Sequence, residues 1–126
     1  TIEGLTMVDM ARKEILPAVE SYLGELSGFA AAKAAAVPGL SGKYETAQIT
    51  RLSGLVDEIY EAAQALDTTL VRLKDISDFT DAAYVIRDVV LQKMAELRVV
   101  CDEAETLTAA KYWPFPTYGD LLFGVR

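Results

Sequence analysis

The feature that most limits how this chain folds is a long stretch almost free of helix-breaking residues. Between Gly42 and Pro114 the sequence contains no proline and one glycine, Gly54. Proline and glycine are the residues that most often interrupt regular structure, so their absence over such a length favours long helices. The sequence therefore predicts an all-α protein.

The first half of this stretch carries an unbroken heptad pattern. From about residue 45 to residue 74, apolar side chains recur in alternating steps of three and four. The positions are Ile49, Leu52, Val56, Ile59, Ala63, Leu66, Leu70 and Leu73. A seam of this kind lies along one side of a helix and packs against a partner helix at a shallow angle.

Two further segments show the same periodicity and predict two more helices, over residues 2–36 and 81–109. The first has apolar side chains at Leu5, Val8, Ile15, Val19, Tyr22, Leu26 and Phe29, with Arg12 at the one skipped position. The second has Ile86, Val90, Met94, Leu97, Cys101, Ala104 and Thr108. Pro17 lies inside the first segment, and because proline removes a helical hydrogen bond we expect a kink near residues 11–16.

Short connections join the three predicted helices. Residues 37–42 hold Pro38, Gly39 and Gly42 and predict a loop, and residues 75–80 predict a turn in which Asp78 or Thr80 caps the next helix. Three long helices with short connections indicate an antiparallel up-down bundle. We therefore predict a single domain, with the bundle in residues 1–112 and a separate C-terminal tail in residues 113–126.

Composition excludes several kinds of chemistry. The chain has 126 residues, no histidine, one cysteine and a net charge of −7. Without histidine there is no Ser-His or Cys-His nucleophile and no histidine-ligated metal, and a lone cysteine forms no zinc cluster or internal disulfide. The acidic balance argues against nucleic acid as a partner, and no segment has the length of a membrane span or the pattern of a targeting signal. A free thiol without disulfides favours a cytoplasmic protein.

One acidic cluster remains as a candidate for chemistry. Asp102, Glu103 and Glu105 lie close together on the third predicted helix. Carboxylates in this spacing serve as a divalent-metal or acid/base site in some proteins, and an independent hydrolase or ligase would use them here. The favoured interpretation is a solvated helix face in which Arg98 pairs with Asp102 one turn later. We therefore predict no catalytic, cofactor-binding or metal-binding residue in this chain.

The C-terminal tail is the most unusual segment. Five of the eleven aromatic residues fall between residues 111 and 123, and Pro114 and Pro116 force an extended path there. Large aromatic rings are costly to leave in water, so the tail is predicted to dock on its own bundle or on another surface. The predicted docking residues are Trp113, Pro114, Phe115, Pro116, Tyr118, Leu121, Leu122 and Phe123.

The string from Trp113 to Phe123 resembles the C-terminal ending of type III glutamine synthetases. Residues 2–7 and 14–18 resemble the start of the C-terminal helical region of that family, and residues 90–105 resemble its last long helix. The resemblance covers nearly the whole chain and is weakest in the loop of residues 37–47.

The resemblance implies a parent enzyme, a glutamate–ammonia ligase of nitrogen metabolism that uses ATP and magnesium. It implies a homo-oligomer of stacked rings, with the active sites between neighbouring subunits. The catalytic residues of the family lie in a β-rich region upstream and none maps onto this chain, so the segment alone is predicted to be inactive. Its role would be structural, and its partners would be its own catalytic body and the neighbouring subunits.

The start of the sequence fits this interpretation. Thr1 is not an initiator methionine, and an amphipathic helix begins at once, so we expect the chain to be a fragment of a longer protein. The resemblance implies that this longer protein is bacterial. Simple processing of the N-terminus is the alternative. A second possibility for function is a stand-alone acidic helical module that recruits a protein partner, and a start codon close to Thr1 would distinguish it.

Overall fold

The computed structural model describes residues 2–116, and every regular element in this range is helical. The first passage of the chain consists of α1 (Ile2–Met10), a π-helical turn at Ala11–Ile15 and α2 (Leu16–Ala36). The second is the single helix α3 (Lys43–Lys74). The third consists of α4 (Phe79–Val85), a π-helical turn at Ile86–Val90 and α5 (Leu91–Leu107). A short 3₁₀ helix follows at Ala110–Tyr112. The all-helical prediction with three long helices is confirmed.

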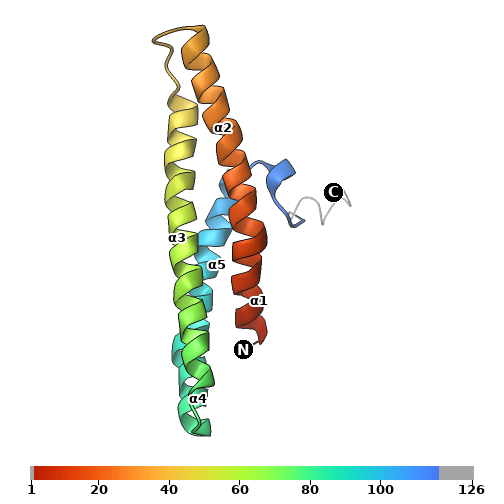
Figure 1. Cartoon of the computed structure of the whole chain (residues 1–126), viewed down its shortest axis with the longest axis vertical. Coiled ribbons are helices and arrows are strands. Elements are labelled where there is room, and N and C mark those ends of the chain that lie inside the picture. The colour runs from red at the N-terminus through yellow and green to blue at the C-terminus, as the bar shows by residue number, and fades with distance from the viewer. Residues whose placement is uncertain (1, 117–126) are drawn as a thin grey trace.

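The molecule is an elongated rod, with α3 in contact with both other passages (Figure 1). The loop of residues 37–42 joins α2 to α3 at one end, and the turn at residues 75–78 joins α3 to α4 at the opposite end. The third passage is shorter than the first two at the loop end. Arg51 of α3 pairs with Glu103 near the end of α5, so the N-terminal turns of α3 continue past the point where α5 stops.

The core lies where all three passages run side by side. Its largest fully buried side chains are Leu52, Leu55, Ile59, Leu66, Leu97, Val19 and Val90. Most of the predicted seam of α3 is buried. However, Leu55, which the predicted seam did not include, is fully buried, whereas Val56 is only half-buried. In the third passage Val90, Leu97, Cys101, Ala104 and Thr108 are buried, as their spacing predicts.

The region around Pro17 shows how a proline is accommodated inside a long helix. Pro17 has no N–H group to complete the usual hydrogen bond, and the turn before it is π-helical, with the Leu16 N–H donating to the Ala11 carbonyl. Where a kink near residues 11–16 was predicted, the structure has a π-helical turn at Ala11–Ile15. Ala11 is buried at this turn, while the neighbouring Arg12 reaches out of the core.

The second π-helical turn, at Ile86–Val90, was not predicted. Leu91 donates its N–H to the Ile86 carbonyl there, and no proline or glycine occurs nearby in the sequence to mark it. The start of the third passage agrees better with expectation. Asp78 is the N-cap of α4, and its side chain accepts a hydrogen bond from the Asp81 N–H at 3.0 Å.

Candidate functional site

The acidic cluster on α5 is divided between separate contacts. Glu103 pairs with Arg51 of α3, whereas Asp102 lies 3.7 Å from Arg98 on its own helix, with both side chains well exposed. Within residues 2–116, no three Asp, Glu, Cys or His side chains are grouped so as to hold a metal ion. The cluster thus has the contacts of a solvated helix face, one residue of which links α5 to α3.

Cys101 lies in the core rather than on a reactive surface. Its side chain is buried among the residues that join α5 to the other helices. Burial, with a smaller effect from the neighbouring Asp102, raises the pKa of the Cys101 thiol to about 11. A thiol with this pKa is protonated at neutral pH and is a poor nucleophile.

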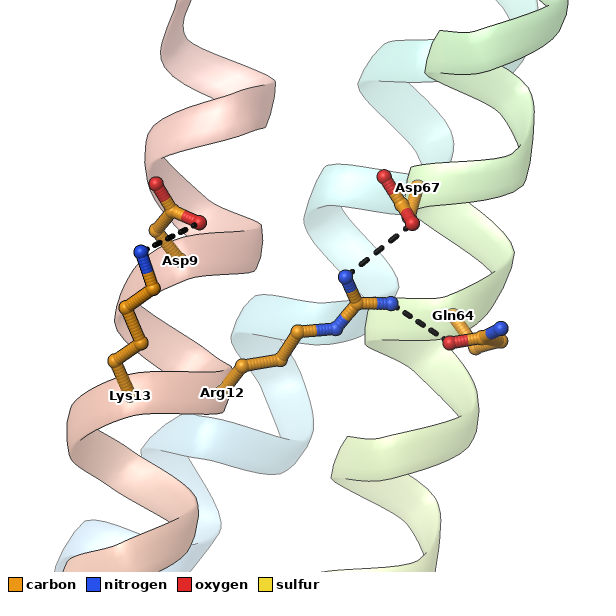
Figure 2. A network of polar contacts seen from close by, with 5 residues as sticks. All are labelled: Asp9, Arg12, Lys13, Gln64 and Asp67. Atoms are coloured by element: carbon orange, nitrogen blue, oxygen red, sulfur yellow. Dashed lines mark hydrogen bonds and ion pairs between the residues drawn. The ribbon is translucent and has the colours of Figure 1, made fainter.

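Several charged side chains form ion pairs between different helices of the described chain. Figure 2 shows Arg12, which reaches from the first π-helical turn to α3. Its guanidinium lies 3.2 Å from the Asp67 carboxylate and donates a hydrogen bond of 2.7 Å to the Gln64 side-chain oxygen. The gap that Arg12 makes in the apolar stripe was visible in the sequence, but its partners were not.

A second interhelical pair joins the loop ends of α2 and α3. Lys33 Nζ lies 2.6 Å from Glu45 Oε1, and the Glu45 residue is only 3% exposed. The pair with Lys33 holds the pKa of the Glu45 carboxyl below its usual value. Sequence reasoning missed this site, because a glutamate in the first turn of a helix is ordinarily a surface residue that complements the helix dipole.

The start of the aromatic tail lies against α2. The ring of Tyr112 contacts that of Tyr22, with 5.7 Å between centroids, and Lys111 Nζ lies 3.1 Å from Glu25 Oε1. Trp113 is 6% exposed and belongs to the core, and its ring meets that of Phe115 edge-on at 6.5 Å. The chain is therefore held to the bundle at the point where the tail begins.

The other predicted docking residues are distributed unevenly. Phe115 and Pro114 are half-buried, and Pro116 is exposed. Tyr118, Leu121, Leu122 and Phe123 lie outside the described residues. Docking by the tail as a whole therefore stays a prediction.

No described helix combines the length and the apolar character needed to cross a membrane. Two comparisons with known proteins give no match, since neither a family model nor a solved structure corresponds to the chain. A curated relative does match: a glutamine synthetase from Butyrivibrio fibrisolvens is 31% identical over 125 residues. The alignment covers 99% of this chain and 18% of the relative. The chain thus spans less than a fifth of that glutamine synthetase and is similar to one region of it.

Proposed function

We propose that this chain is the non-catalytic C-terminal helical region of a type III glutamine synthetase and that it supports the assembly of the parent enzyme. The observation that carries the proposal is the alignment of almost the whole chain with a glutamine synthetase. The all-helical structure supports it as well, because the resemblance in the sequence is to a helical region of that family.

The structural role is supported by where the polar side chains are used. Arg12, Lys33 and Arg51 each join two passages of the chain through an ion pair. Pairs of this kind hold helices in a fixed relation, although exposed ion pairs contribute little free energy individually. We propose an antiparallel bundle that acts as a rigid strut against the catalytic body or a neighbouring subunit.

The aromatic tail would fasten this strut. Trp113 is buried in the bundle, and the segment that follows it carries Tyr118, Leu121, Leu122 and Phe123. We propose that these side chains dock on the bundle, the catalytic body or a neighbouring subunit and so tie them together. ATP, magnesium and the ligation of ammonia to glutamate would belong to the parent enzyme, a cytoplasmic homo-oligomer, and not to this segment.

The first test is to read the coding sequence upstream of the Thr1 codon. A continuous frame of several hundred codons with glutamate- and histidine-containing strand motifs would support the parent enzyme. A start codon within a few residues of Thr1 would overturn it. The second candidate, a stand-alone acidic interaction module, would then be favoured, because its net charge is −7 and several large apolar side chains are exposed.

The second test removes the tail from the full-length parent. Deletion of the region that corresponds to residues 113–126 should lower both the stability of the oligomer and the rate of glutamine formation. A matched control replaces Val99, an exposed apolar residue of α5, with serine and should change neither quantity. A truncated enzyme that keeps its assembly and its activity would show that the tail does not fasten the bundle.

A further inference from the structure

Two regions at opposite ends of the rod are left uncovered by the rest of the described chain (Figure 1). The hairpin end, residues 27–44, contains the last turns of α2, the loop and the start of α3. The acidic end, residues 75–84, contains the turn after α3 and most of α4. Neither region contains a buried residue, although both contain large apolar side chains.

The hairpin end is apolar and basic. Phe29, Val37, Leu40 and Tyr44 are exposed there, with exposed fractions from 49% to 61%. Its charged residues are Lys33 and Lys43, with no acidic residue among residues 27–44. Lys33 is paired with Glu45, whereas the Lys43 ammonium forms no ion pair within the described part of the chain. Among residues 2–116, an apolar surface therefore lies beside a cation that has no ion-pair partner.

The acidic end has the opposite charge and a similar apolar content. Phe79 is 87% exposed and Tyr84 is 57% exposed. Asp75, Asp78 and Asp81 lie in this region, and residues 75–84 include no cation. The Asp78 carboxylate caps α4, while those of Asp75 and Asp81 form no ion pair with another described residue.

This complementarity of charge is the argument for which surface would cover each end. Two hairpin ends brought together would place like-charged Lys43 side chains side by side, and two acidic ends would repel each other more strongly because they carry three aspartates each. A hairpin end meeting an acidic end pairs opposite charges and covers exposed aromatic rings on both sides. We propose that the hairpin end of one copy of this chain docks on the acidic end of a second copy.

The proposed contact is head-to-tail, and such contacts close into rings or continue as open chains. This contact adds a specific interface to the structural role proposed above. It rests on that proposed role only for the place that it would have in a larger assembly. Because each end is small, the interface falls at the low end of the size range for specific contacts and should be weak in isolation. Its charges are exposed, so it should also weaken as salt is added.

The contact is tested on the 126-residue chain by sedimentation velocity over a concentration series. We expect the average mass to rise with protein concentration in about 20 mM salt and to fall towards the monomer in about 500 mM salt. Phe79→Ser should reduce association, whereas Val99→Ser, which changes an exposed apolar residue on the side of the rod, should leave it unchanged. Circular dichroism establishes that each variant is folded.

Charge reversal at each end tests the pairing itself. Lys43→Glu alone and Asp75→Lys with Asp81→Lys should each weaken association by about fivefold or more, because each places like charges in contact. An equal mixture of the two variant proteins should associate again, since each altered end then finds an end of opposite charge. Lys13→Glu, an exposed reversal away from both ends, is the matched control.

A chain that remains monomeric at every concentration in low salt would overturn the proposal. So would association that neither set of reversals affects, or a mixture that fails to recover it. A fourth contrary result would be a disulfide that forms readily between two Ser41→Cys copies but not between a Ser41→Cys copy and a Thr80→Cys copy. None of these outcomes depends on the upstream reading frame, so this contact and the proposed parent enzyme stand or fall separately.

Discussion

Helices α2 and α3 form both the packed middle of the rod and its hairpin end. Large apolar side chains on these helices are buried in the middle and exposed at the hairpin end. On α2, Leu26 is 3% exposed, whereas Phe29, one turn further along the same apolar stripe, is 52% exposed. On α3, Leu52 is fully buried while Tyr44 is 61% exposed. The difference is the third passage, which covers the middle and stops short of the hairpin end (Figure 1). At the hairpin end, the burial of apolar side chains on α2 and α3 is therefore limited by where α5 ends.

The largest effect should come from a cavity in the packed middle. Leu66 is fully buried, and Leu66→Ala should lower the free energy of unfolding by about 2–5 kcal/mol through lost burial and an unfilled space. Leu40→Ala makes the same chemical change in the hairpin end, where the side chain is half exposed. It should change the free energy of unfolding by about 0.5 kcal/mol or less. Urea denaturation of both variants measures the contrast, and equal losses would contradict the comparison.

The periodicity of apolar residues was enough to predict which side chains are buried in the middle of the rod, but not at its ends. The three–four spacing of α3 identified Leu52, Ile59, Ala63, Leu66 and Leu70, all of which are buried. The three–four spacing of the first predicted helix placed Phe29 on its apolar stripe. This residue is exposed because α5 stops short of this part of α2. The length of the covering helix depends on tertiary contacts that no local pattern contains.

A second contrast lies in the reactivity of thiols. The Cys101 thiol in the middle has a pKa of about 11, so at pH 8 its thiolate is about 100-fold scarcer than that of an ordinary cysteine. A thiol introduced by Ser41→Cys in the exposed loop should therefore react with a disulfide reagent about 10-fold faster than Cys101 or more, because the greater intrinsic nucleophilicity of a high-pKa thiolate offsets part of its lower population. Labelling followed by absorbance measures both rates in one protein. Similar rates would show that the middle opens readily.

Glycine substitutions should give smaller effects of opposite sign. Gly28 lies in α2 with nothing within 4 Å of an added Cβ, so Gly28→Ala should raise the free energy of unfolding by about 0.5–1 kcal/mol through helix propensity. Gly39 has a φ of +84°, and Gly39→Ala should lower the free energy of unfolding by about 1 kcal/mol because an L-residue is strained at this φ. Thermal unfolding compares the two. A loss of stability in Gly28→Ala would mean that another backbone approaches α2 closely.

The candidate site shows a different limit of sequence reasoning. The aromatic tail stood out by composition, and Trp113 is the residue that the bundle buries in the described part of the tail, residues 113–116. The interhelical pairs of Arg12 with Asp67 and of Lys33 with Glu45 left no such mark, because their partners lie far apart in sequence and meet only through the alignment of two helices. Composition is enough to identify an unusual segment. To predict an ion pair between two helices, one must also know how the helices are positioned relative to each other.

The smallest predicted effect concerns Glu45, which lies at the boundary between the covered and uncovered parts of α3. The ion pair with Lys33 keeps the pKa of the folded Glu45 carboxyl below the value of 4.5 expected in the unfolded chain. The stability that this pair contributes is therefore fully present above pH 4.5 and is lost as the pH falls through the lower folded pKa. Glu45→Gln should remove this part of the acid-dependent loss, and Lys33→Met should remove it as well, because each eliminates one member of the pair. Urea denaturation between about pH 3 and pH 7 measures how stability depends on pH. If the two variants lost stability with acid as steeply as the original chain, the Lys33–Glu45 ion pair would not contribute to stability at this boundary. The burial of Glu45 would then depend on its apolar neighbours alone.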